Sequence, residues 1–271
     1  MKKSWFDHRV VRLGGAIVLV VALASSWIWW RARPDGRLHI IAPALAGDAL
    51  LIITPHGDTL LVDGGRDADG VATFVGERLP FWRRSIDALV LTRADDDHLP
   101  GALALARRYS VRQALLPSGD DAQMLALRTA LTEESASINP AAVGQTLLVD
   151  GVRVTVLQAA TRDGGATLAV QYGAFTALLA PMVDDAQASK LLANAPPAAI
   201  VWWPWTRPDD RAIAEKTRAT TVLYSESTSG RPDPRTLFER GSTERRLLHE
   251  DVNGTIEIST DGTQLWIETE R

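Results

Sequence analysis

Short apolar blocks separated by turn residues run along the whole of this sequence. The blocks at 38–42 and 86–91 are mostly apolar, and residues 152–157 alternate; both patterns indicate β-strands. Pro, Gly and Asp at 55–58 form a turn signal between two such blocks, so residues 49–62 are predicted to form a β-hairpin. Further strands are predicted by the same criteria at residues 114–116, 146–149, 166–172, 176–180, 199–203, 220–224, 247–248, 255–259 and 265–267.

Four other segments space their apolar residues as an amphipathic helix does. These segments are residues 72–79, 100–109, 122–131 and 186–193. Strands mixed with helices of this length favour an α/β fold in which mixed sheets are layered against helices. No internal repeat and no low-complexity linker interrupts the pattern.

Residues 14–30 contain no charged side chain and are mostly apolar. This is the short end of the length that spans a bilayer as a helix, and three tryptophans at its end suit a membrane interface. We therefore expect a transmembrane anchor at 14–30, a short basic tail at 1–13 and a juxtamembrane linker at 31–37. The alternative is a cleaved signal peptide, because residues 22–24 match the Ala-x-Ala pattern of a cleavage site.

The charge of the chain is unevenly distributed. The 271 residues carry a net charge of −4, but residues 1–37 hold seven Lys/Arg and two Asp, which leaves −9 for the remainder. Four cationic residues before the predicted span against three after it place the N-terminus in the cytoplasm and the body outside the cell membrane. A cleaved signal peptide predicts the same side. The acidic body disfavours nucleic acid as a partner, and the absence of cysteine excludes disulfides and thiolate ligands.

The side chains with the clearest chemistry follow the predicted strand at 86–91. Asp95, Asp97 and His98 lie within four positions of one another. Two carboxylates and one imidazole could hold Mn²⁺, Mg²⁺ or weakly bound Zn²⁺, with Asp97 as the candidate catalytic residue. Arg93 precedes them, and its guanidinium cannot lose a proton to become a ligand. The competing interpretation is that Arg93 pairs with Asp95 or Asp97 and balances charge where a metal would lie.

Several motifs occur in an order that resembles a known family. They are a hairpin with Gly-Asp before it and Asp-Gly-Gly after it (47–65), the strand at 86–92, the turn at 93–98 and the end segment at 253–262. The turn resembles the H-x-[HD]-x-D-H signature of metallo-β-lactamase-fold hydrolases. Together the motifs are similar to the metallo-β-lactamase-like domain of the ComEC family. The members of this family are membrane proteins that take up DNA in natural competence.

The resemblance covers residues 38–271 and implies one metallo-β-lactamase-like domain there. It implies an αββα sandwich, in which two mixed sheets are flanked by helices. It also implies that active members bind one or two Zn²⁺ at the sandwich edge and hydrolyse phosphodiesters, lactams or esters.

Three positions depart from the ligands that the resemblance implies. Arg93 stands where the family has its first His, and Met182 stands where it has a bridging Asp. Trp205 lies in a loop that contains a His in the family. Because the scaffold motifs persist while these positions differ, the resemblance implies a degenerate metal site.

Two further groups of residues have two interpretations each. Asp63, in Asp63-Gly64-Gly65, either supports the metal turn with its carboxylate or simply begins a turn that needs glycine. Trp202, Trp203 and Trp205 would provide a stacking platform for bases if they were exposed. Aromatic residues on a strand more often pack into a core, and we favour that interpretation.

These observations predict a membrane-anchored, non-catalytic binding or assembly module related to the DNA-uptake protein, with a decayed metal site and no cofactor. Its partner would be an unidentified protein or the DNA-uptake machinery. The alternative is a divergent metal-dependent hydrolase, nuclease-like or phosphodiesterase-like, that uses one Zn²⁺ or Mn²⁺ held by Asp95, Asp97 and His98. A DNA-handling module that does not cleave is a third hypothesis, which the acidic body disfavours.

Overall fold

A computed structural model describes residues 34–225 and 245–271 of the chain. Every described helix and strand lies in the unit that begins at Gly36. The predicted tail and anchor at 1–30 lie outside the described residues. None of the helices within the described ranges is long and apolar enough to cross a membrane.

The first of two sheets contains eight strands in the order β15-β14-β1-β2-β3-β4-β5-β6. Neighbouring strands are antiparallel from β15 to β3 and parallel from β3 to β6. The strands are β1 (Leu38–Ala42), β2 (Leu50–Ile53), β3 (Thr59–Val62), β4 (Ser85–Val90), β5 (Ser110–Leu116), β6 (Ser137–Pro140), β14 (Ile256–Thr260) and β15 (Leu265–Thr269).

The second sheet contains seven strands in the order β13-β12-β11-β10-β9-β8-β7. Its strands are antiparallel from β7 to β10 and parallel from β10 to β13. They are β7 (Thr146–Val149), β8 (Val152–Gln158), β9 (Thr167–Tyr172), β10 (Phe175–Leu179), β11 (Ile200–Pro204), β12 (Thr221–Ser225) and β13 (Arg246–Leu248).

Three hydrophobic clusters join the sheets and helices into four layers. The central cluster fills the space between the two sheets and includes Trp202. A second cluster lies between the first sheet and three helices, where Leu61 of β3 and Leu105 of α3 are both buried. The third lies between the second sheet and two helices and includes Leu178 and Leu191. The helices are α2 (Ala68–Arg78), α3 (Pro100–Arg108), α4 (Ala122–Glu133), α5 (Asp185–Asn194), α6 (Asp210–Thr217) and the short α8 (Glu250–Asn253).

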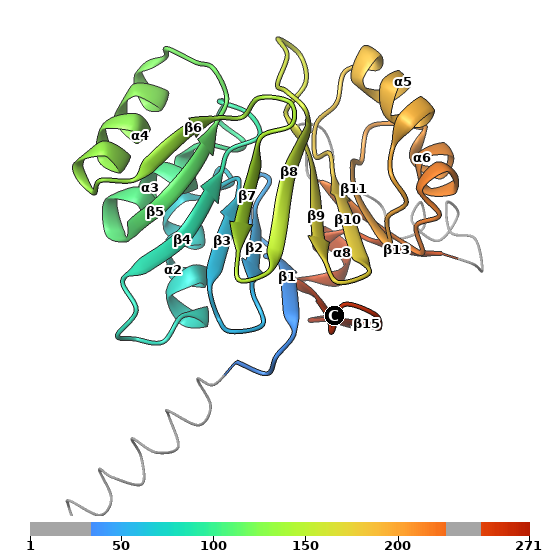
Figure 1. Ribbon diagram of the computed structural model, residues 1–271, viewed down its shortest axis with the longest axis horizontal. Coiled ribbons are helices and arrows are strands. Elements are labelled where there is room, and N and C mark those ends of the chain that lie inside the picture. The colour runs from blue at the N-terminus through green and yellow to red at the C-terminus, as the bar shows by residue number, and fades with distance from the viewer. Residues whose placement is uncertain (1–33, 226–244) are drawn as a thin grey trace, which may run out of the picture. The chain divides into compact units, whose positions relative to one another are not determined.

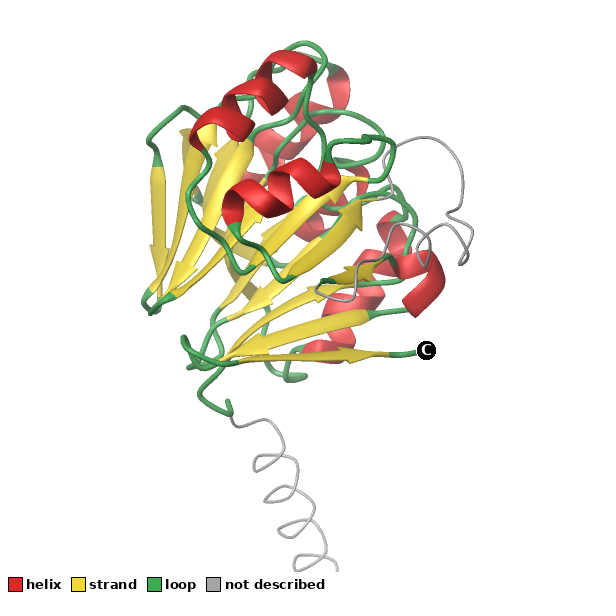
Figure 2. Ribbon diagram, turned by 90° about the vertical axis from the view of Figure 1, so that its right-hand side faces the viewer, coloured by secondary structure: helices red, strands yellow, loops and turns green. Residues whose placement is uncertain are grey.

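The figures show the same layering. Helices α2, α3 and α4 lie beside the first sheet, and α5 and α6 lie beside the second (Figure 1). Figure 2 looks from the right-hand side of Figure 1 and shows helices lying across the face of the second sheet. The predicted α/β fold, an αββα sandwich of two mixed sheets flanked by helices, is therefore confirmed.

Two opposite edges of the sandwich matter for function. Strands β3, β4 and β5 are parallel neighbours, so their starts share one edge and their ends share the other. Strand β1 runs in the same direction as β3, because both are antiparallel to β2. We call the edge where β1, β3, β4 and β5 begin the base edge. We call the opposite edge, where β3 and β4 end, the site edge.

Candidate functional site

The turn at residues 92–98 lies at the site edge, directly beyond β4. Its first residue, Thr92, is held by Asp63. Asp63 follows β3, and its carboxylate accepts hydrogen bonds from the Thr92 backbone N–H at 2.6 Å and from the Thr92 hydroxyl at 2.7 Å. The Asp63 side chain is fully buried. Burial raises the pKa of Asp63 to about 7, although the charge of His98 and the bonds from Thr92 act to lower it. Asp63 therefore supports the turn from inside the fold.

Glycines let three backbone segments meet beneath the turn. A Cβ on Gly64 would lie 1.9 Å from the backbone nitrogen of Ala102, and a Cβ on Gly47 would lie 2.5 Å from the carbonyl oxygen of Asp97. Gly64 also donates its backbone N–H to the carbonyl of His98 at 2.6 Å. Contacts this close leave no room for a side chain, so the glycines set the position of the turn.

His98 points inward and is surrounded by acidic side chains. Its side chain is 0% exposed, and its Nδ1 lies 2.5 Å from Oδ1 of Asp95. Its Nε2 lies 3.3 Å from Oδ2 of Asp48, an ion-pair distance without hydrogen-bond alignment. Burial lowers the pKa of His98, but Asp48 and Asp95, with the charge of Asp63, outweigh burial and raise this pKa well above its ordinary value. Both ring nitrogens thus face carboxylates, and neither faces an open position.

Asp95 and Asp97, the two aspartates predicted to be ligands, are each bound by an arginine. The Nε of Arg93 lies 2.6 Å from Oδ2 of Asp95, and Nη2 of Arg93 donates to the Arg162 carbonyl at 3.2 Å. Asp97 accepts from Nε of Arg66 at 2.8 Å and also contacts Nη2 of Arg66. Burial raises the pKa of Asp95, yet His98 and Arg93 together hold it below its ordinary value. The pairing of Arg93 with Asp95 agrees with the charge-balancing interpretation of the sequence.

The predicted metal ligands do not fit a metal ion in this arrangement. A zinc or manganese ion needs several side-chain lone pairs directed at one point. Here Asp95 and Asp97 direct oxygens at two different guanidinium groups, and the nearest partner of His98 Nδ1 is Asp95 itself. Within residues 34–225 and 245–271, no group of three or more His, Asp or Glu side chains is arranged to hold a metal ion.

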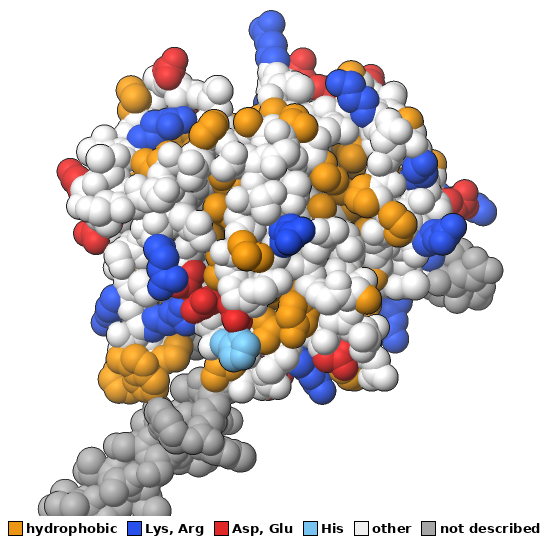
Figure 3. Space-filling view, in the orientation of Figure 1, with side chains coloured by type: hydrophobic (Ala, Val, Ile, Leu, Met, Phe, Trp, Pro, Cys, Tyr) orange, Lys and Arg blue, Asp and Glu red, His pale blue; other side chains and the backbone are white. Residues whose placement is uncertain are grey.

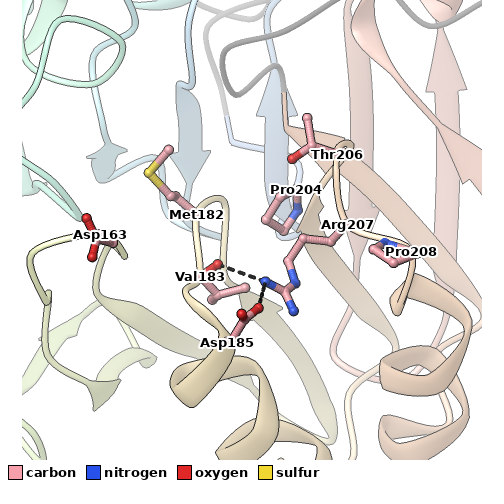
Figure 4. A pocket seen from close by; sticks show the side chains of 8 residues that line it. All are labelled: Asp163, Met182, Val183, Asp185, Pro204, Thr206, Arg207 and Pro208. Carbon is pink, nitrogen blue, oxygen red and sulfur yellow. Dashed lines mark hydrogen bonds and ion pairs between the residues drawn. The ribbon is translucent and has the colours of Figure 1, made fainter.

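A pocket lies beside the turn, at the ends of β10 and β11. It has a volume of about 390 Å³ and contains Met182, the residue at the predicted bridging position. Figure 4 shows Arg207 on one side, bonded to Asp185 and to the Val183 carbonyl, and Asp163 on the other. The backbone carbonyl of Met182 accepts from Gly165 at 2.9 Å. The pocket thus offers one guanidinium and two carboxylates, but no imidazole lines it.

Trp205 lies in an aromatic cluster with Tyr224 and His249. Its ring packs edge-on against Tyr224, with centroids 4.9 Å apart, and against His249, with centroids 5.5 Å apart. Burial lowers the pKa of His249 to about 4, so this imidazole is neutral near pH 7. Trp202 and Trp203 are 0% exposed, which confirms the core interpretation for these two and excludes them from a stacking platform.

Asp48 and Arg66 belong to the site, but the sequence did not identify them as site residues. Asp48 faces His98, and Arg66 binds Asp97 across 31 positions of the chain. A signal was present, because the Gly-Asp and Asp-Gly-Gly motifs place both residues in turns that lead toward the site edge. That signal gave the location of the turns and no information on which side chains would meet there.

Comparisons with known proteins show the fold. No protein-family model matches the sequence, and no curated protein matches it either. Among solved structures, the metallo-β-lactamase-fold protein YhfI from Bacillus subtilis superposes with a TM-score of 0.60 at 13% identity, covering 85% of this chain and 100% of that one. A diphosphatase from the PhnP family gives 0.52 at 15% identity, covering 78% and 95%. Zn²⁺-bound PqqB from Methylobacterium extorquens gives 0.50 at 13% identity, covering 78% and 97%. The chain therefore has the metallo-β-lactamase fold.

Proposed function

We propose that this protein is a non-catalytic module that keeps the metallo-β-lactamase scaffold and has replaced its metal by arginines. The observation that carries the proposal is the pairing of Asp95 with Arg93 and of Asp97 with Arg66. A guanidinium supplies the positive charge that a metal would supply, but it offers no open coordination position for water. Without a metal-bound water, the fold lacks the nucleophile that metal-dependent hydrolysis requires.

The proposal includes a membrane anchor and a protein partner. Residues 14–30 support the anchor by their composition, and the positive-inside rule supports a body outside the cell membrane. The ordered motifs that resemble the ComEC domain support a role in the assembly of DNA-uptake machinery. The pocket at the site edge, lined by Asp163, Asp185 and Arg207, supports contact with a partner there, and a body charge of −9 favours protein over nucleic acid.

Metal content tests the proposal directly. The full-length chain, purified in detergent and dialysed against Zn²⁺ or Mn²⁺, is expected to retain less than stoichiometric metal by elemental analysis. His56 is 84% exposed on its side chain and pairs with Asp150, so among the histidines of residues 34–225 and 245–271 it is the one most open to adventitious zinc. Any residual zinc should therefore disappear in His56→Ala and persist in His98→Ala.

The opposite result would establish the alternative function. Stoichiometric metal that is lost in His98→Ala and kept in His56→Ala would contradict the proposal. Metal-dependent cleavage of single-stranded DNA or a model phosphodiester by the same preparation would then identify a single-ion hydrolase. That enzyme would have to displace both arginines from Asp95 and Asp97 before the ion could bind.

A further inference from the structure

The loop between α2 and β4 presents two aromatic side chains to solvent. Phe81 is 73% exposed and Trp82 is 51% exposed, and their rings meet edge-on with centroids 4.8 Å apart. The other large apolar side chains that are well exposed in the described part of the chain are aliphatic and lie elsewhere: Leu125, Val143 and Leu148. In Figure 3, hydrophobic side chains gather at the lower left, where Figure 1 shows this loop.

The aromatic loop is held firmly in place by Arg83. The Arg83 guanidinium contacts the Gly57 carbonyl in the β2–β3 turn and the buried carboxylate of Asp87. Its backbone N–H also closes the loop onto the Pro80 carbonyl at 2.8 Å. Arg84 follows in the sequence and is also exposed. The loop thus presents two aromatic rings and one exposed cation at the base edge.

The chain enters the domain at this same edge. Strand β1 begins at Leu38, and the pairings of β1 through β4 place that residue at the edge where the loop leads into Ser85 of β4. A span that ends at Trp30 leaves residues 31–37 as the connection, and seven extended residues reach about 24 Å at most. The base edge is therefore the part of the domain that a membrane anchor would keep nearest to the lipid.

We infer that Phe81 and Trp82 insert into the headgroup region of the membrane and fix the domain with its base edge toward the bilayer. This inference rests on the anchor in the proposed function. Tryptophan favours the lipid–water interface because it combines a large apolar ring with one hydrogen-bond donor. Arg84 lies where its guanidinium can reach lipid phosphate. The site edge then faces away from the membrane and is open to a partner.

Single-cysteine labelling tests the inference, because the chain contains no cysteine of its own. Phe81→Cys and, separately, Trp82→Cys are labelled with an environment-sensitive fluorophore in the full-length chain reconstituted into phosphatidylcholine vesicles. Lipids brominated near the headgroup are expected to quench both probes and shift their emission to the blue. Val143→Cys is the matched control, since Val143 is 68% exposed and precedes β7 at the opposite edge; its probe should not respond.

The outcomes separate this inference from the anchor. A chain that sediments with vesicles while the probes at 81 and 82 behave like the one at 143 would overturn the inference alone. A chain that remains in the supernatant would overturn the anchor and the inference together. Probes that are shielded in proportion to protein concentration, without quenching by brominated lipid, would show that a second copy of the chain covers the aromatic loop, which also overturns the inference.

Discussion

At the scale of single residues, the acidic turn is bound by arginines. Arg93 and Arg66 each take one carboxylate of the turn, and His98 lies behind them between Asp48 and Asp95. Buried carboxylates need a nearby positive charge, and a guanidinium satisfies that need while also donating directed hydrogen bonds. The arginine pairs thus give these acidic residues a structural role that needs no metal ion.

Removal of Arg66 should destabilise the fold more than removal of a surface arginine. The side chain of Asp97 is only 12% exposed, so Arg66→Ala leaves a largely buried charge without its main partner. We expect a loss of about 1–2 kcal/mol in the free energy of unfolding, because the exposure of Arg66 softens the full penalty of a buried pair. Denaturant titration in detergent measures it.

Arg211→Ala is the control for that measurement. Arg211 pairs with Glu215 in a helix, where both side chains are more than half exposed. Pairs of this kind contribute below about 0.5 kcal/mol. Equal losses in the two variants would show that Asp97 does not depend on Arg66.

Asp63 should make stability depend on pH. Its pKa is raised on folding from 3.8 to about 7, so the folded chain binds this proton more tightly than the unfolded chain does. The resulting stabilisation is complete below the unfolded pKa and is lost as the pH rises through the folded one. Relative to Asp63→Asn, the wild type should therefore lose on the order of a few kcal/mol between about pH 4 and pH 8. The free energy of unfolding of each protein is measured by denaturant titration at several pH values in this range. The prediction would be contradicted if the difference between the two proteins did not change with pH.

Elements with local signals were predictable from the sequence, and elements defined by distant contacts were not. The hairpin of β2 and β3 has a turn motif between two apolar runs, so its position followed from pattern alone. Strand β6 was missed because its residues are polar and it pairs on one side only, with β5. Helix α6 was missed because only Ile213, Ala214 and Thr217 are buried in an otherwise polar segment. Helix α2 begins four residues earlier than predicted, because Asp67 caps it by accepting from the Gly70 backbone N–H.

In the site, too, local features were predictable from the sequence and contacts between distant residues were not. The sequence located the turn and its arginine, since both lie in one motif. It did not indicate that Asp48 and Arg66 would meet that turn, because the meeting depends on how β2, β3 and α3 pack. Gly64 is the residue that brings these elements into contact.

Gly64→Ala should therefore be far more destabilising than its small size suggests. The new Cβ would overlap the backbone of Ala102 at the start of α3. Both the segment that contains Gly64 and helix α3 would have to shift their backbones to relieve the overlap, which costs more than the movement of a side chain. We expect a loss of about 3 kcal/mol or more, from overpacking. The comparison is Gly144→Ala, where nothing lies within 4 Å but the φ of +83° is unfavourable for alanine. That strain costs about 1 kcal/mol, so thermal unfolding that ranks Gly144→Ala as the worse variant would show that the packing beneath the turn can relax.

At the scale of the whole molecule, the two edges of the sandwich carry different kinds of residue. The base edge receives the chain from the N-terminal segment and presents Phe81 and Trp82. The site edge carries the arginine-filled turn and the pocket with Arg207. If the anchor holds the base edge at the membrane, the opposite edge is available to a partner on the outer side. That arrangement depends on the orientation of the proposed anchor, which the positive-inside rule assigns from the charges on either side of residues 14–30.

The positive-inside rule orients the proposed anchor by a margin of a single charge, so the predicted orientation should be easy to reverse. The double substitution Lys2→Gln and Lys3→Gln leaves two cationic residues before the predicted span and three after it. Because Lys and Arg close to a span set its orientation, a fraction of the molecules should then place the body in the cytoplasm. Val143→Cys reports the side, since a membrane-impermeant maleimide reaches this exposed position in intact cells only when the body is outside.

A matched loss of charge within the body separates orientation from general effects. Arg107→Gln with Arg108→Gln removes the same two charges from an exposed helix end, where long translocated domains are insensitive to charge. Labelling at 143 should stay at the wild-type level in this variant and fall in the Lys2/Lys3 variant. Equal labelling in both would mean that something other than the terminal charges orients the chain. A shortened chain released from the membrane would identify residues 1–24 as a signal peptide, since cleavage after Ala24 gives the same side without an anchor.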